Sequence, residues 1–130
     1  MIANAGIAGA VAASLSGRDI PVILDPVMIA KGGAPLLQPD AVTMVRDSLL
    51  PLATVLTPNL PEAAHLLGAD VAKTRAEMET QGRMLCALGA ASVLMKGGHL
   101  EGDDSPDCLV TPNAVTWFEA ARTATRNTHG

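Results

Sequence analysis

Polar residues able to bind ions follow three separate apolar segments of the chain. The segments are PVILD (21–25), TVLT (54–57) and ASVLMK (91–96). Short apolar runs bounded by Pro, Gly or charged residues are typical of buried β-strands. The first ends in Asp25, the second leads to Glu62, and the third ends in Lys96. Since ligands bind outside the carboxyl ends of the strands in an open parallel sheet, we expect these three residues to meet at one edge.

Together these side chains suit the binding of a metal ion and a phosphate. Asp25 and Glu62 offer carboxylate oxygens of the kind that Mg²⁺ prefers. Lys96 can hold a phosphate oxygen as a point charge. The Gly-Gly pair after it, and Gly130, let backbone N–H groups come close to an anion. This combination favours phosphoryl transfer, in which positioning and charge neutralisation dominate; the chain has no GxxxxGK[ST] motif, which excludes a P-loop enzyme.

Each of these residues also has a simpler structural interpretation. Asp25 could cap the turn that follows it, because Asp-Pro is a common turn dipeptide. Glu62 lies where a helix dipole favours any acid. Lys96 could be a solvated strand end, although its place between an apolar run and Gly-Gly favours a functional role. His99 suits either a phosphate contact or a backbone hydrogen bond, His65 is expected on a helix surface, and the histidines lack the spacing of a zinc site.

The elements that must position the site alternate between helix and strand. Helices are expected over residues 4–16, 39–50, 59–68 and 74–89, and a hairpin around Pro112-Asn113 between DCLVT and AVTWFEA. The order α-β-α-β-α-α-β implies right-handed crossovers and a parallel sheet that is covered on both faces.

The longest predicted helix has the clearest start signal. Thr74 with Glu77 three residues later has capping-box spacing. Its apolar face is expected to comprise Met78, Met84, Leu85 and Leu88, with the two methionines filling the core.

Composition limits the class of protein further. A chain of 130 residues forms one domain at most. A net charge of −4 with 2% aromatic residues argues against binding nucleic acid. No apolar run approaches the ~20 residues of a membrane span, and the first residues lack the basic start of a signal peptide. Cys86 and Cys108 have no CxxC spacing, and are expected as small core residues in a reducing cytoplasm.

The motifs LDPVM, TPNLPEA and MKGGH, in this order and spacing, resemble the hydroxymethylpyrimidine/phosphomethylpyrimidine kinases of thiamine biosynthesis. These enzymes belong to the ribokinase-like superfamily, and the resemblance runs from Met1 to Gly130. It implies a three-layer α/β/α fold with a mostly parallel sheet, in which residues 1–130 form the central part of a single kinase domain. Pyridoxal kinases share the Asp-Pro-Val and Thr-Pro-Asn elements, whereas KGGHLEGDDSPDCLV favours the pyrimidine enzymes.

The resemblance implies a kinase that uses Mg-ATP to phosphorylate 4-amino-5-hydroxymethyl-2-methylpyrimidine and then its monophosphate. It assigns a role to each of several positions: Asp25 and Glu62 at the Mg²⁺–phosphate region, Lys96 near the ATP phosphates, Val27 and Met1 at the pyrimidine pocket, and Thr128 and Gly130 at the approach to the anion hole. The family further implies a homo-oligomer.

The chain also departs from the family pattern. In the family, NTHG is followed by Thr-Gly-Cys, whose backbone donors and cysteine base lie beyond Gly130, so no catalytic base is expected within the chain. Strands before Met1 are missing as well, and Lys31-Gly32-Gly33 replaces Lys-Ser-Gly. Because one preorganised donor set is worth ~10²–10³ in rate, the 130 residues alone are expected to have negligible kinase activity. A pyridoxal kinase and a non-catalytic kinase remnant are the alternatives.

Overall fold

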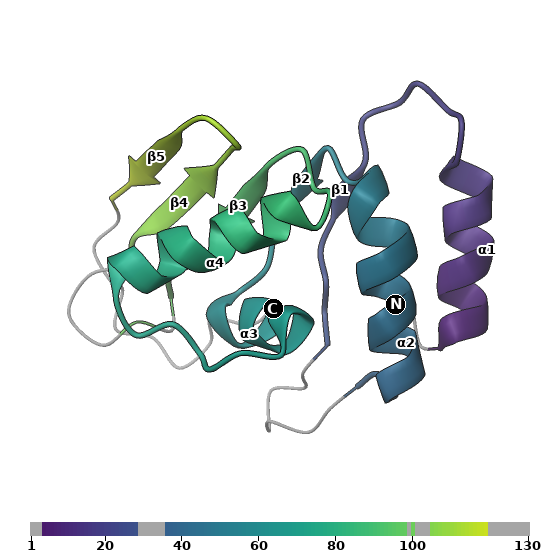
Figure 1. The fold of residues 1–130 in the computed structure, drawn as a ribbon, viewed down its shortest axis with the longest axis horizontal. Helices are drawn as coiled ribbons and strands as arrows, with labels where there is room; N and C mark the ends of the chain where they lie inside the picture. The colour runs from purple at the N-terminus through teal and green to yellow at the C-terminus, as the bar shows by residue number, and fades with distance from the viewer. Residues whose placement is uncertain (1–3, 29–35, 99, 101–104, 120–130) are drawn as a thin grey trace.

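The computed structural model describes residues 4–28, 36–98, 100 and 105–119. The chain forms, in order, α1 (Ala5–Leu15), β1 (Ile23–Leu24), α2 (Pro39–Met44), η1 (Val45–Leu49), η2 (Leu50–Leu52), β2 (Val55–Leu56), α3 (Leu60–Leu67), α4 (Arg75–Ala87), β3 (Val93–Met95), β4 (Asp107–Val110) and β5 (Val115–Phe118). Figure 1 shows α1 and α2 side by side at one end and the β4–β5 hairpin at the other. The predicted order of helices and strands, including the hairpin, is confirmed.

The five strands form one mixed sheet in the order β1-β2-β3-β4-β5. The first three are parallel, with Leu24 beside Leu56 and Leu56 beside Val93. β4 and β5 are antiparallel additions, and Met95 pairs with Cys108. The carboxyl ends of β1, β2 and β3 therefore lie at the same edge of the sheet.

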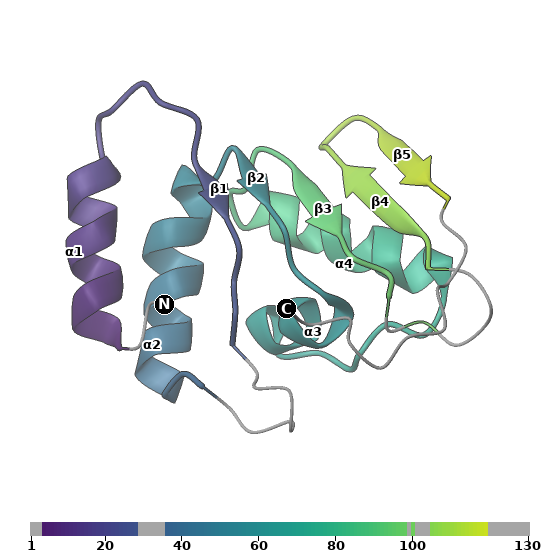
Figure 2. The same ribbon diagram turned by 180° about the vertical axis from the view of Figure 1, so that it is seen from behind.

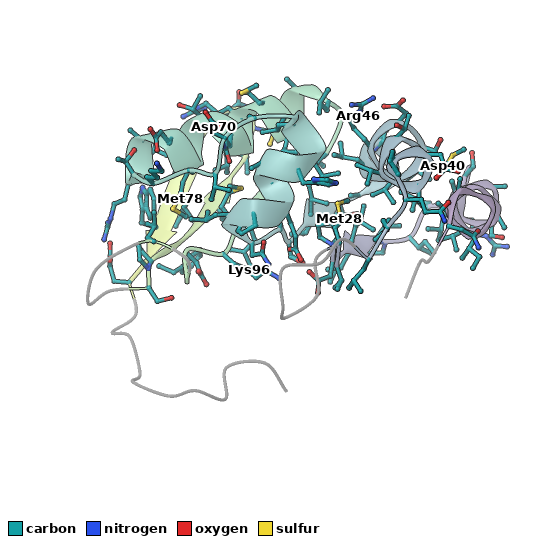
Figure 3. The ribbon with its side chains drawn as sticks, turned by 90° about the horizontal axis from the view of Figure 1, so that it is seen from below. Met28, Asp40, Arg46, Asp70, Met78 and Lys96 are labelled. Carbon is teal, nitrogen blue, oxygen red and sulfur yellow. The ribbon has the colours of Figure 1, made fainter. Side chains whose placement is uncertain are left out.

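The helices lie on one side of this sheet in the part of the chain that the structure describes. α4 packs across β3 and β4, and α3 packs against α4. The view from below shows the helices above the strands, with Met78 between α4 and the sheet (Figure 3), and the view from behind shows the strands in front of α4 (Figure 2). The α/β class is confirmed, and the described residues contain two of the three expected layers.

Side-chain caps explain where the helices begin. The Asn4 side chain accepts the Ile7 N–H at the start of α1. α3 and α4 both begin with a capping box, in which the cap side chain and the glutamate three residues later satisfy each other's backbone N–H. The predicted Thr74–Glu77 box is confirmed. α3 ends at Gly68, whose left-handed φ of 63° suits a residue without a side chain.

The helix predicted over 39–50 changes its winding before it ends. Pro51 has no N–H to donate to the preceding turn. The Leu50 N–H bonds to the Val45 carbonyl five residues back, which gives a π-helical turn over Val45–Leu49 before the 3-10 turn of Leu50–Leu52.

The core-facing side of α4 differs from the prediction. Met78, Gln81, Gly82 and Leu85 are buried, whereas Met84 is 46% exposed and Leu88 is 41% exposed. Met84 lies about 240° around the helix from Met78, so the prediction that both methionines fill the core is wrong for Met84. A Cβ on Gly82 would lie 2.6 Å from Val110 Cγ2, which shows how closely α4 approaches β4.

β1 is less buried than its apolar sequence suggests. Leu24 is buried, but the Ile23 side chain is 72% exposed. β1 has a hydrogen-bonded neighbour strand on one side among the described residues, namely β2. Successive side chains of a strand point to opposite faces, so the prediction of a buried strand at 21–25 is confirmed for Leu24 and wrong for Ile23, which points to the face that no described helix covers.

Candidate active site

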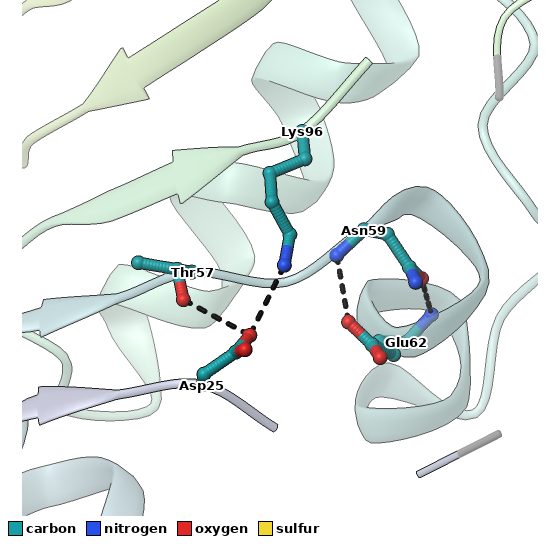
Figure 4. Close-up of polar contacts among 5 residues, drawn as sticks. All are labelled: Asp25, Thr57, Asn59, Glu62 and Lys96. Carbon is teal, nitrogen blue, oxygen red and sulfur yellow. Dashed lines mark hydrogen bonds and ion pairs between the residues drawn. The ribbon is translucent and has the colours of Figure 1, made fainter. Parts of the chain in front are cut away.

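Side chains from the ends of β1, β2 and β3 meet at one point of the sheet edge. Lys96 Nζ lies 3.0 Å from Asp25 Oδ1, and Thr57 Oγ1 donates to the same oxygen at 3.1 Å (Figure 4). These residues come from three separate strand ends, and Lys96 is 71 positions from Asp25. The structure thus brings together the strand-end residues that the sequence pattern places at one edge.

Asp25 faces its neighbours rather than its own turn. Both contacts of its side chain go to Oδ1, and none of the described residues donates to Oδ2. The side chain is 53% exposed. The half-exposed Asp25 carboxylate therefore has one oxygen that is held by two neighbours and a second that no described residue contacts, which suits a metal ligand, and its side chain does not cap the turn.

Glu62 contributes a second carboxylate from the first turn of α3, and it is 4% exposed. Its Oε2 accepts the Asn59 N–H at 2.8 Å, and Asn59 Oδ1 accepts the Glu62 N–H at 2.8 Å (Figure 4). Burial raises the pKa of Glu62, and the nearby Asp25 charge raises it further, while backbone N–H groups and the Lys96 charge act in the opposite direction. Asp25 and Lys96 therefore shift the pKa of Glu62 in opposite directions.

The raised pKa of Glu62 predicts a pH dependence of stability. A raised pKa means that Glu62 binds its proton more tightly in the folded state than in the unfolded state. The protonated Glu62 side chain therefore stabilises the fold fully below its ordinary pKa of 4.5, and this stabilisation is lost as pH rises through the raised pKa. In Mg²⁺-free urea titrations, the unfolding free energy of Glu62→Gln minus that of the parent is expected to increase from about pH 4 to about pH 7.

Glu77 supplies a matched control, since it closes the other capping box. Backbone hydrogen bonding from Lys73 lowers the pKa of Glu77, so its stabilising contribution is present above the ordinary value and lost as pH falls. The unfolding free energy of Glu77→Gln minus that of the parent is therefore expected to decrease from about pH 4 to about pH 7. Over the same range, the corresponding difference for Glu62→Gln increases. Parallel trends in the two variants would contradict the assignment of a raised pKa to Glu62.

The donor set at this edge fits Mg²⁺. The ion is commonly bound through one or two carboxylates, waters and substrate phosphates rather than by a complete protein cage. The described residues contain no group of three or more His, Cys, Asp or Glu side chains that could hold a metal. A divalent cation would also favour the charged form of Glu62, which burial disfavours.

Backbone pairing fixes the strand ends that carry these groups. The Thr57 N–H donates to the Leu24 carbonyl at 2.9 Å, and the Lys96 N–H donates to the Pro58 carbonyl at 2.9 Å. A parallel bridge between Asn59 and Lys96 extends the pairing beyond β2 and β3. Thr57 and Asn59 belong with Glu62 to the polar cluster that follows the apolar run at 54–57, and the Thr-Pro-Asn sequence directly after that strand is the signal for both.

An apolar cavity of about 520 Å³ opens beside Asp25. Its lining includes Val27 and Met28 after β1 and Val11 of α1. Val27 is 44% exposed and Met28 is buried. The predicted pyrimidine-pocket residue Val27 is therefore next to both the carboxylate and a hollow, whereas Met1, His99, Thr128 and Gly130 lie outside the described residues.

Comparison with known proteins identifies the family. The sequence profile described as phosphomethylpyrimidine kinase matches residues 1–130, the whole chain. The chain belongs to the phosphomethylpyrimidine kinase family. It is 52% identical over 131 residues to the hydroxymethylpyrimidine/phosphomethylpyrimidine kinase of Escherichia coli K12, covering 100% of this chain and 49% of that protein.

Solved structures of two related kinases match this member of the phosphomethylpyrimidine kinase family. An ADP complex of Bacillus subtilis pyridoxal kinase matches with a TM-score of 0.88 and 32% identity, over 100% of this chain and 48% of that one. The phosphomethylpyrimidine kinase of Clostridium difficile 630 matches with a TM-score of 0.83 and 35% identity, over 92% and 52% of the two chains. The chain thus spans about half the length of the relatives that it matches.

Three further observations concern the helices, His65 and the two cysteines. None of the helices in the described parts of the chain has the length and apolar character of a membrane span. His65 is exposed, as expected for a helix surface. Cys108 is fully buried and burial raises its pKa to about 11, while Cys86 is half-buried; neither forms a disulfide.

Proposed function

We propose that this protein phosphorylates 4-amino-5-hydroxymethyl-2-methylpyrimidine with Mg-ATP and then phosphorylates the resulting monophosphate. The observation that carries the proposal is the convergence of Asp25, Glu62 and Lys96 at one sheet edge, in a chain that is 52% identical to a kinase of that name. Since the chain covers about half of such kinases, the activity is proposed for the complete gene product.

Each residue of the site has a task in this proposal. The Lys96 ammonium moves from Asp25 to an oxygen of the transferred phosphoryl group and stabilises the charge that spreads over it. The freed Asp25 carboxylate and Glu62 would hold Mg²⁺, directly or through waters. Mg²⁺, when bound, neutralises charge on the β- and γ-phosphates. Short strands and a capped helix fix the backbones of these residues, so that only the Lys96 side chain needs to move.

The proposed pocket for the pyrimidine is based on the apolar cavity beside Asp25 and on the family resemblance. The apolar hollow beside Asp25 suits a flat ring, and Val27 lies on its wall. Met1 at the pyrimidine pocket, and Thr128 and Gly130 at the approach to the anion hole, remain predictions from the resemblance. A cytoplasmic location and a homo-oligomer are proposed on the same basis.

A second candidate activity is the phosphorylation of pyridoxal. It is favoured by the TM-score of 0.88 to a pyridoxal kinase that covers the whole chain. Both substrates are aromatic rings with a hydroxymethyl group, so the same phosphate site serves either one. A non-catalytic remnant is the third alternative.

Release of ADP by the complete gene product separates these alternatives. With Mg-ATP, kcat/KM for the hydroxymethylpyrimidine is expected to exceed that for pyridoxal by about ten-fold or more, a difference of ~1.4 kcal/mol in transition-state binding. Chelation of Mg²⁺ with EDTA should abolish the release. A preference for pyridoxal would support the second candidate, and no release with either compound would leave the remnant.

A further inference from the structure

The backbone turn that follows Lys96 is held by a side chain from the next strand. The Gly97 N–H donates to Asp107 Oδ1 at 2.8 Å, ten residues along the chain. Asp107 is the first residue of β4, and Gly97 is buried. A carboxylate is a strong acceptor for a backbone N–H because the bond is charge-assisted.

The bond comes from a side chain rather than from the backbone ladder of the sheet. β3 and β4 pair from Val93–Val110 to Met95–Cys108, and the next residues, continuing the register, are Lys96 opposite Asp107 and Gly97 opposite Pro106. Pro106 keeps its carbonyl but has no N–H for a reciprocal pair, and the Gly97 N–H donates to the Asp107 carboxylate instead of to a backbone carbonyl. Without the Asp107 carboxylate, the buried Gly97 N–H would lose its acceptor, which is costly for a buried donor.

Lys96 is consequently fixed on both sides along the chain. Its own N–H is bound by the Pro58 carbonyl at 2.9 Å, and the following amide is bound by Asp107 at 2.8 Å. Between these two anchors the side chain extends to Asp25. We propose that Asp107 is a positioning residue that directs the Lys96 ammonium group into the phosphate site. This inference rests on the proposed function, and it assigns Asp107 no contact with the substrate.

Two substitutions in the complete gene product distinguish positioning from charge. Asp107→Asn keeps an acceptor oxygen for the Gly97 N–H, whereas Asp107→Ala removes it. Asp107→Ala is expected to raise the KM for Mg-ATP and lower kcat/KM by about ten-fold, equivalent to ~1.4 kcal/mol, with an unchanged KM for the pyrimidine. Asp107→Asn should stay within about three-fold of the parent, because the hydrogen bond is rescued.

Glu119→Ala is the matched control. Glu119 is also a carboxylate near the hairpin, but its side chain pairs with Arg75 and, among the described residues, bonds to neither Lys96 nor Gly97. It should leave the KM for Mg-ATP unchanged. A purely structural role for Asp107 would lower the unfolding free energy of Asp107→Ala without changing the kinetics of the folded molecules, and that result would overturn the inference.

Calorimetry with Mg-ADP tests the role of Asp107 without requiring that the pyrimidine be the substrate. If the parent binds Mg-ADP but phosphorylates no pyrimidine, the proposed function fails. The inference then stands only if Asp107→Ala weakens Mg-ADP binding by about ten-fold and Asp107→Asn does not. Equal affinities of the parent and Asp107→Ala, or no Mg-ADP binding by the parent, would overturn it.

Discussion

Replacement of Lys96 by methionine is expected to lower kcat/KM for Mg-ATP by about 10²–10³, the usual cost of removing one preorganised charge from a developing transition state. Methionine keeps much of the length of lysine but carries no charge. The Lys96 side chain is 39% exposed and its partner Asp25 is 53% exposed, so loss of the ion pair should change folding little. Steady-state kinetics of the complete gene product, with circular dichroism of both proteins, measures the two effects separately.

Lys73→Met is the control for this variant. Lys73 precedes α4, and its backbone N–H donates to Glu77. Among the described residues it bonds to none of Asp25, Thr57 and Glu62, so kcat/KM should remain within about two-fold of the parent. A loss of less than about three-fold in Lys96→Met would refute the assignment of Lys96 to the phosphate site.

Gly97→Ala is expected to produce the largest loss of stability. A Cβ at this position would overlap the carbonyl oxygen of Pro106 and would lie 3.2 Å from Met78 Cε. Since the first obstacle is backbone, no side-chain rotation relieves it, and β3 and β4 must move apart at the point where Asp107 binds the turn. We expect a decrease of about 3 kcal/mol or more in the unfolding free energy, measured by urea titration.

Replacement of the neighbouring Gly98 tests whether the loss of stability is specific to position 97. A Cβ on Gly98 would have Ser105 Oγ at 3.4 Å, an ordinary contact with a side-chain atom. Gly98→Ala should therefore change the unfolding free energy by about 1 kcal/mol or less. Similar losses in both alanine variants would show that the close approach of Gly97 to Pro106 is not what requires glycine.

The strand-end pattern predicted the assembly of the site well. Asp25 and Lys96 meet because parallel strands place their carboxyl ends together, which depends on topology and is readable from alternating helices and strands. The capping box at Thr74 was predicted because its signal is local, two residues at fixed spacing. Most of the fold could therefore be predicted from local sequence signals and from the order of helices and strands.

Other features depend on packing that one sequence does not specify. Ile23 is exposed because its side chain points to the face of the sheet opposite to Leu24, which no described helix covers, and an apolar run reads the same whether one face or both are covered. Met84 looked like a core residue because hydrophobicity does not determine which side of a helix faces the sheet. Asp107 was missed because its bond to the Gly97 N–H depends on the register between β3 and β4, which only the structure supplies.

A crystal structure of the complete gene product with Mg²⁺ and a non-hydrolysable ATP analogue would test the central claim most directly. The account predicts that the terminal phosphate lies at the carboxyl ends of β1, β2 and β3, with Lys96 Nζ on a phosphate oxygen. Asp25 and Glu62 should hold Mg²⁺ directly or through one layer of water. A nucleotide bound elsewhere, or a phosphate site in which Lys96 still pairs only with Asp25, would contradict it.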